Sequence, residues 1–346
     1  MGVGTKRRTP NRGSYRYHVL AVRFLTSCSA AGNHVEQFIR IANQMGNPAS
    51  SRLSLAVASL VIAVQSFAQM PTGPRYRTIT LHSTVFNNTR SLRVWLPKNY
   101  DDPANLKKRY PVLYLNDGVM TFAQKGVNIA TIVDGLVEKG EIPPIIVVGI
   151  DNGACTDKTT NQEVDRAYEF LPYPDTGFGP DNTYQPAPPD PHGKLYPRFL
   201  TEDVFPVVNQ TLRTMTGAEF TAIGGYSYGA TSALYCAAMM PKTFGMVLLE
   251  SAPLWIGPNG ELLNDCNKCH QWPPHVRIGL GTAEGESNTA ISMKGVELTK
   301  QLISSIRAND PQCDLSFVLE EGAHHGPVDW GRRMPEDLKA LFKARS

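Results

Sequence analysis

The sequence predicts an α/β protein with one mostly parallel β-sheet, an antiparallel pair of strands at its N-terminal end, and helices on both faces. Two segments of alternating polarity, 75–82 and 91–96, predict the antiparallel pair. Six short, continuously apolar segments follow, as is typical of parallel strands buried on both faces. Helical patterns alternate with these segments, which indicates right-handed crossovers between parallel strands.

The elements are expected in the following order. Buried strands, recognised by apolar and β-branched runs, are predicted at 111–116, 144–150, 219–225, 245–250, 276–281 and 315–319. Helices, recognised by apolar residues spaced three and four apart, are predicted near 129–139, 197–213, 230–240, 294–308 and 335–344. With 42% hydrophobic and 19% charged residues, the composition excludes a disordered chain, a collagen and a coiled coil. We therefore expect a single domain over 69–346.

One long segment interrupts this alternation. Residues 151–194 show no apolar periodicity, and seven prolines gather in their second half. A segment of this length within a compact domain is typical of a lid or a binding loop. Its aromatic residues favour packing, so we expect a substrate-facing loop here.

The first 68 residues differ in composition from the rest. They carry eight basic residues and one acidic residue, Glu36. The apolar run 53–64 is too short to cross a membrane, and Ala68 ends a small-residue cleavage pattern. The sequence predicts a leader over 1–68, made of an over-extended start and a signal peptide at 45–68. We expect cleavage between Ala68 and Gln69 and a secreted or periplasmic protein without stable membrane insertion.

The charge of the remaining chain bears on its partners. From residue 69 onward there are 26 basic and 30 acidic residues, a slight acidic excess. A nucleic-acid partner requires a basic face on the folded part, so this class of function is not expected.

The clearest chemical motif is G-x-S-x-G at residues 225–229, which lies between a predicted strand and a predicted helix. In this setting the serine occupies a strained turn that projects its Oγ above the sheet. Gly225 and Gly229 suit the turn because it leaves no room for side chains there. The helix behind it directs its positive end toward developing negative charge. Ser227 is therefore the candidate nucleophile.

A serine nucleophile requires a base and an acid. In folds where this motif joins a strand to a helix, the acid follows the serine along the chain and the histidine follows the acid. His324 and His325 lie in the loop after the last strand, where the base is expected. Glu284 follows the preceding strand and is the candidate acid, with Glu286 as an alternative. The acid holds the imidazole in the correct tautomer and stabilises its cation.

With these motifs, the sequence resembles the putative-esterase family of α/β-hydrolases, which includes enterochelin esterases, esterase D and the secreted mycolyltransferases. The resemblance runs from about residue 75 to the C-terminus. It is carried by 93–100, 110–118, Arg166 with 169–172, 199–206, the 225–229 motif, 281–284, and His325 with Trp330.

The resemblance implies an α/β-hydrolase fold, a serine esterase activity and no cofactor or metal. It implies that Ser227 is the nucleophile and Glu284 the acid, with an oxyanion hole from the backbone N–H groups of Val119 and Tyr228. The spacing to Trp330 favours His325 as the base, whereas a Gly-x-His pattern favours His324.

The resemblance also bears on the substrate. Arg166, Glu169 and Tyr226 are expected near it, with a solvated Arg166–Glu169 ion pair as the alternative. Siderophore esters, plant-wall glycan esters such as feruloyl or acetyl esters, and simple small-molecule esters all fit.

Three other functions compete with ester hydrolysis. An acyltransferase would use the same triad with an alcohol in place of water, and a binding module would use the same fold without catalysis. A redox or haem protein would use the C-x-x-C-H pattern at 266–270, in a predicted loop. A zinc site there would have to recruit His275 or Cys155, and disulfides among Cys155, Cys266, Cys269 and Cys313 remain open.

Overall fold

The computed structural model describes residues 70–153, 162–175, 177 and 190–343. All of them belong to a compact unit that spans Phe67–Ser346. The predicted leader, its cleavage site, Cys155 and most of the proline-rich part of 151–194 lie outside the described residues.

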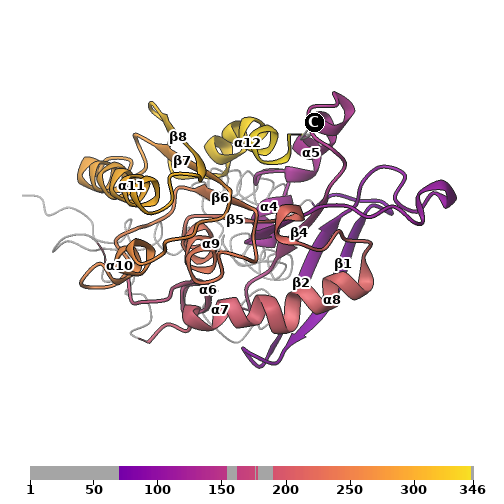
Figure 1. The fold of residues 1–346 in the computed structure, drawn as a ribbon, viewed down its shortest axis with the longest axis horizontal. Helices are drawn as coiled ribbons and strands as arrows, with labels where there is room; N and C mark the ends of the chain where they lie inside the picture. Colours follow the sequence, from indigo (N-terminus) through magenta and orange to yellow (C-terminus); the bar gives the residue numbers. More distant parts are fainter. Residues whose placement is uncertain (1–69, 154–161, 176, 178–189, 344–346) are drawn as a thin grey trace, which may run out of the picture. The chain divides into compact units, whose positions relative to one another are not determined.

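The described residues form one eight-stranded sheet in the order β1-β2-β4-β3-β5-β6-β7-β8 (Figure 1). β1 and β2 are antiparallel, β2 is antiparallel to β4, and the remaining neighbours are parallel. All eight predicted strands are thus confirmed. Their bounds are Tyr76–Ser83 (β1), Asn88–Trp95 (β2), Val112–Asn116 (β3), Ile146–Ile150 (β4), Thr221–Tyr226 (β5), Met246–Glu250 (β6), His275–Gly281 (β7) and Asp314–Glu320 (β8).

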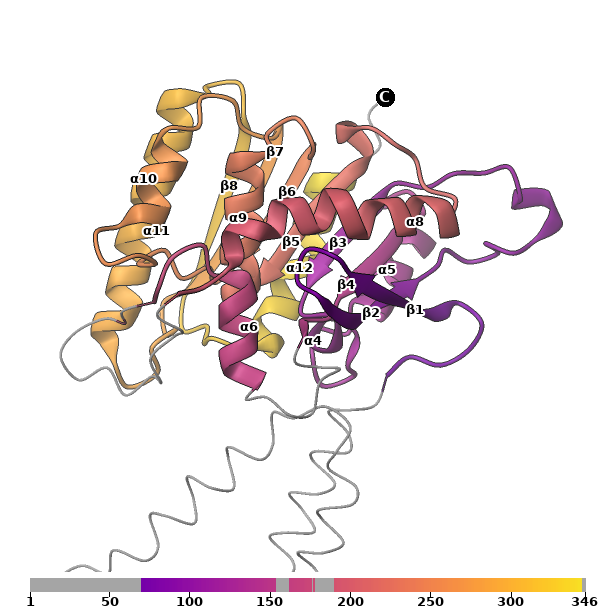
Figure 2. The same ribbon diagram turned by 90° about the horizontal axis from the view of Figure 1, so that it is seen from below.

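Helices pack on both faces of this sheet, as the sequence predicts. Along β3, Val112 and Tyr114 enter one apolar core, while Leu113 and Leu115 enter the other. This alternation explains why the strand is apolar throughout. α5 and α12 cover one face, and α8 and α9 lie over the other (Figures 1 and 2).

The bounds of the helices are as follows. The α-helices are Gly118–Phe122 (α4), Ile129–Glu138 (α5), Gln162–Phe170 (α6), Tyr196–Arg198 (α7), Phe205–Thr211 (α8), Tyr228–Met239 (α9), Glu261–Asn267 (α10), Thr289–Asn309 (α11) and Pro327–Phe342 (α12). Short 3-10 helices lie at Pro103–Asn105 (η1), Gly193–Leu195 (η3) and Ala218–Phe220 (η5), and a short π-helix lies at Phe199–Val204 (η4).

The helices differ from the prediction in several places. The expected helix at 197–213 is divided into α7, η4 and α8, and α12 begins at Pro327 rather than Pro335. The expectation that 151–194 is all loop is wrong, because α6 lies within it. α10 likewise replaces part of the loop expected around Cys266. Among the described residues, no helix is long and apolar enough to cross a membrane.

The carboxyl ends of the parallel strands lie along one edge of the sheet. Asn116 pairs with Ile150, Tyr226 with Glu250, and Gly281 with Glu320, all at or near strand ends. The loops after these strands therefore gather at one edge, where open α/β sheets place their ligands.

Candidate active site

Ser227 lies in the tight turn between β5 and α9, at this carboxyl edge. Its backbone angles are φ 53° and ψ −129°, a strained conformation for a residue with a side chain. Its backbone N–H donates to the carbonyl of Glu250 at 2.9 Å, which ties the turn to the end of β6. The turn therefore has the geometry of a nucleophile elbow.

The two glycines of the motif allow the chain to pass closely. A Cβ on Gly225 would lie 2.5 Å from the carbonyl carbon and oxygen of Gly229. A Cβ on Gly229 would lie 2.6 Å from the Oδ2 of Asp117. Both contacts are far shorter than real Cβ contacts, which accounts for glycine on both sides of the serine.

His325 and Glu284 meet at the same edge from neighbouring strands. His325 follows β8, and its Nδ1 lies 2.6 Å from the Oε2 of Glu284, in the loop after β7. The carboxylate can only accept, so Nδ1 carries the proton and Nε2 is left as the basic nitrogen. Burial acts to raise the pKa of Glu284, but the hydrogen bonds and charge around it prevail and lower that pKa; His325 makes the largest of these contributions, followed by Ser251 and Gly281. Glu284 is thus held in its charged form.

The two alternative residues occupy other surroundings. His324 is exposed, as His325 is, but the bond it makes to a carboxylate comes from its backbone: its N–H donates to the Oδ2 of Asp329 at 2.7 Å. Glu286 is also exposed. Of the four candidates, the structure brings His325 and Glu284 together.

Ser251, which the sequence interpretation did not single out, holds the other oxygen of Glu284. Its Oγ donates to Glu284 Oε1 at 2.6 Å, and the same oxygen accepts from the backbone N–H of Gly281 at 2.7 Å. The Nε1 of Trp330 donates to Ser251 Oγ at 2.9 Å. The position of Ser251, directly after β6 at the carboxyl edge, is the signal from which it could have been found.

Trp330 joins the Ser227 side of the candidate site to His325. Its ring stacks on Tyr226, next to Ser227, with centroids 5.2 Å apart, and contacts the His325 ring edge-on at 5.1 Å. Within the described residues no hydrogen bond joins Ser227 to His325. Hydrogen bonds between catalytic groups are often long in the absence of substrate and tighten when the substrate binds.

The backbone N–H groups expected to form the oxyanion hole lie at two helix starts. Val119 is the second residue of α4 and Tyr228 the first of α9. The amide of Asn116 donates to the carbonyl of Gly229 at 2.8 Å, which joins the two turns. Helix starts favour negative charge nearby.

Arg166 and Glu169, expected near the substrate, have separate partners. Arg166 donates to both carboxylate oxygens of Asp117, at 2.6 and 2.7 Å, and its guanidinium lies over the Tyr228 ring. Glu169 is only 3% exposed, and its carboxylate accepts two bonds of 2.7 Å from Arg90. Glu169 is therefore not part of the solvated Arg166–Glu169 ion pair that the sequence left as an alternative.

Tyr226, also expected near the substrate, is 1% exposed. Both residues are therefore buried: Glu169, in α6, is held by Arg90, and Tyr226 stacks on Trp330 next to Ser227.

The cysteines do not form disulfides among the described residues. Cys236, Cys266, Cys269 and Cys313 are free thiols, and the first three are buried. In the same part of the chain, no group of three or more His, Cys, Asp or Glu side chains is arranged to hold a metal ion. His275, a possible zinc ligand, instead contacts Asp314, with Nδ1 to Oδ2 at 2.9 Å.

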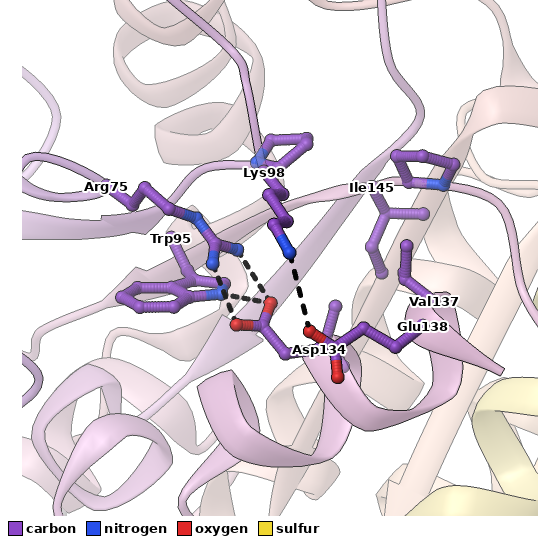
Figure 3. Close-up of a pocket in the computed structure, with 10 residues that line it drawn as sticks. Arg75, Trp95, Lys98, Asp134, Val137, Glu138 and Ile145 are labelled. Atoms are coloured by element: carbon purple, nitrogen blue, oxygen red, sulfur yellow. Dashed lines mark hydrogen bonds and ion pairs between the residues drawn. The ribbon is translucent and has the colours of Figure 1, made fainter.

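A small cavity of about 30 Å³ lies away from this site (Figure 3). Figure 3 shows Asp134 beside Arg75 and Trp95, both of which donate to its carboxylate. Ile145, which also lines the cavity, directly precedes β4. The cavity is therefore at the amino end of the parallel strands, opposite Ser227.

Comparisons with solved structures show the same fold. A siderophore hydrolase from Aspergillus nidulans matches with a TM-score of 0.60 and 19% identity, over 76% of this chain and 95% of that one. An IroE-like serine hydrolase from Shewanella oneidensis matches with a TM-score of 0.57 and 20% identity, over 78% and 82%. The enterobactin esterase of Shigella flexneri matches with a TM-score of 0.57 and 19% identity, over 80% and 61%. At these identities the likeness concerns the α/β-hydrolase fold.

The model of one protein family also matches the sequence. It is described as "Putative esterase", and it covers residues 83–341, from the end of β1 almost to the end of α12. The chain therefore belongs to the Putative esterase family, and its enzyme class is that of the carboxylic ester hydrolases.

Proposed function

We propose that this esterase is an exported serine hydrolase that works through Ser227, His325 and Glu284. The observation that carries the proposal is the 2.6 Å contact between His325 Nδ1 and Glu284 Oε2, at the sheet edge where the elbow presents Ser227. The contact leaves Nε2 of His325 as the base for a serine hydroxyl.

The reaction proceeds in two halves. Ser227 Oγ attacks the ester carbonyl while His325 takes its proton, and the N–H groups of Val119 and Tyr228 stabilise the oxyanion. Each such donor contributes about 3 kcal/mol in comparable sites. The intermediate then collapses, the bond to the alcohol breaks, and His325 returns the proton to the leaving oxygen. Water repeats these steps on the acyl-enzyme and releases the acid.

The substrate class is a small-molecule, siderophore or glycan ester. This class is supported by structural neighbours that include a siderophore hydrolase and a ferulic acid esterase. In this proposal Arg166 borders the substrate, whereas the buried Glu169 and Tyr226 support the elements around it.

Export is proposed from the leader. The apolar run 53–64 and the small residues before Gln69 support cleavage by a signal peptidase. N-terminal sequencing of the protein recovered from the periplasm or medium tests this, and a product that keeps residues 45–68 contradicts it.

Hydrolysis of p-nitrophenyl acetate and butyrate by the wild type and Ser227→Ala tests the activity. We expect turnover by the wild type and a loss of at least about a thousandfold in the variant. Full activity in Ser227→Ala contradicts the proposal. Repeating the assay with an added alcohol, and identifying the acyl product, distinguishes a hydrolase from an acyltransferase.

A further inference from the structure

Four side chains form a continuous hydrogen-bonded chain behind the base. Trp330 Nε1 contacts Ser251 Oγ at 2.9 Å, Ser251 Oγ contacts Glu284 Oε1 at 2.6 Å, and Glu284 Oε2 contacts His325 Nδ1 at 2.6 Å. The members come from the loops after β6, β7 and β8 and from α12. They connect three strand ends to one helix.

The chemistry of the first member sets the direction of the whole chain. An indole N–H can only donate, so Ser251 Oγ must accept from Trp330. The single hydrogen of Ser251 is then directed to Glu284 Oε1. That oxygen also accepts from the backbone N–H of Gly281 at 2.7 Å. Both of its donors are therefore supplied by the protein, and Oε2 is left for the N–H of His325.

The end of this hydrogen-bonded chain that lies farthest from His325 is shielded from water. Trp330 is 5% exposed and Ser251 is 3% exposed, so water does not compete with their hydrogen bond. Ser251 has φ 51°, in the left-handed region that favours glycine. A serine at this strained position indicates that the hydroxyl is used.

Resting on the function proposed above, we propose that Trp330 and Ser251 are positioning residues for catalysis. They fix the side chain of Glu284 and thereby keep the proton of His325 on Nδ1. Neither touches the substrate. Without them Glu284 can rotate, and the imidazole loses the orientation that presents Nε2 to Ser227.

Three substitutions test this inference. Trp330→Phe keeps an aromatic ring for packing on Tyr226 and His325 but removes the indole N–H. Ser251→Ala removes the hydroxyl and keeps the strained backbone, whereas Ser251→Gly removes the hydroxyl and relieves the strain. Trp95→Phe is the matched control, because it removes an indole N–H that bonds Asp134 far from the site.

We expect kcat to fall about 10- to 100-fold in both Ser251 variants, as for a hydrogen bond to a charged group. It should fall about 3- to 10-fold in Trp330→Phe, as for a neutral hydrogen bond. KM should change less than about twofold in each case.

The double variant Trp330→Phe/Ser251→Ala should be no slower than Ser251→Ala, because the indole acts only through the hydroxyl. The acidic limb of the kcat/KM profile should move to higher pH in the Ser251 variants, because Ser251 helps to lower the pKa of Glu284.

Thermal unfolding verifies that each variant is folded, and Ser251→Gly guards against a strain effect in Ser251→Ala. Wild-type kcat in folded Ser251→Gly and Trp330→Phe, or additive losses in the double variant, would overturn this inference alone. A wild type without esterase activity, or an active Ser227→Ala, would instead overturn the proposed function.

Discussion

The guanidinium of Arg166 donates from Nε and Nη2 to the two carboxylate oxygens of Asp117, at 2.6 and 2.7 Å. Asp117 is the N-cap of α4 and has φ 61°, and α4 carries Val119. A residue from α6 thus braces the turn that holds one proposed oxyanion donor. Only arginine among the cationic residues offers this planar, two-pronged geometry.

Arg166→Lys should lower kcat by about tenfold, because one point charge replaces the bidentate pair and the turn that carries Val119 loosens. Steady-state kinetics on a p-nitrophenyl ester measure the effect. Arg198→Lys is the control, since Arg198 makes a similar two-bond contact with Glu202 on an exposed helix surface. Equal kcat values for the two variants would contradict the bracing role.

Glu284→Gln should lower kcat by about 10³- to 10⁴-fold with little change in KM. The amide keeps the size of the carboxylate but removes the charge that stabilises the imidazolium. Glu286→Gln, two residues along on an exposed position, should stay within about twofold of the wild type. If Glu286→Gln has the larger effect, the assignment of the acid is wrong.

Gly225→Ala should destabilise the fold by about 1 to 3 kcal/mol or more, because its Cβ meets the Gly229 carbonyl at 2.5 Å. Gly135→Ala is the matched control: it lies within α5, where a Cβ meets nothing within 4 Å, and alanine there should stabilise by up to about 1 kcal/mol. Urea unfolding at pH 7 measures both. A Gly225→Ala variant as stable as the wild type would show that the turn is not sterically closed.

Most of the strands could be predicted because burial on both faces produces a recognisable local sequence pattern. β3 to β7 are buried on both faces and are therefore apolar at nearly every position, whatever their partners. The elbow was also predictable, since its two glycines and serine lie within five residues of one another.

The remainder depends on contacts that no local pattern contains. α6 has a polar sequence, and its residues Arg166 and Glu169 are held by Asp117 and Arg90, which are 49 and 79 residues away. Ser251 acquires its contacts from Glu284 and Trp330, both at least 33 residues distant. Such pairs become neighbours only once the sheet is assembled.

Two buried carboxyl groups lie close to the site, on Glu250 and Asp337. Glu250 accepts from Arg333 through Oε2, whereas Glu250 Oε1 and Asp337 Oδ2 have no donor among the described residues. Burial raises the pKa of Glu250 well above its ordinary value, and it raises the pKa of Asp337 from 3.8 to about 6. Burial therefore favours the protonated forms of both carboxyl groups.

Because folding raises the pKa of Asp337, the native state holds an extra proton between pH 3.8 and about 6. This stabilisation is fully present below pH 3.8 and is lost as the pH rises through about 6. The side chain of Asp337→Asn is neutral at every pH and has no such titration. The free energy of unfolding of the variant, relative to the wild type, should therefore be higher at pH 7 than at pH 4, by about 1 to 3 kcal/mol.

Urea unfolding of both proteins at the two pH values measures this difference. Glu321→Gln, at an exposed position, should give the same relative stability at both. A relative stability of Asp337→Asn that is higher at pH 4 than at pH 7 would contradict the raised pKa of Asp337.

The central claim is that Ser227 is a nucleophile activated by His325. Labelling with a fluorophosphonate probe, followed by peptide mass spectrometry of the adduct, tests it most directly in the wild type and in Ser227→Ala, His324→Ala and His325→Ala. We predict an adduct on Ser227 in the wild type and in His324→Ala, and little or none in His325→Ala and Ser227→Ala. A folded wild type without an adduct, or labelling that depends on His324 instead, would contradict the account.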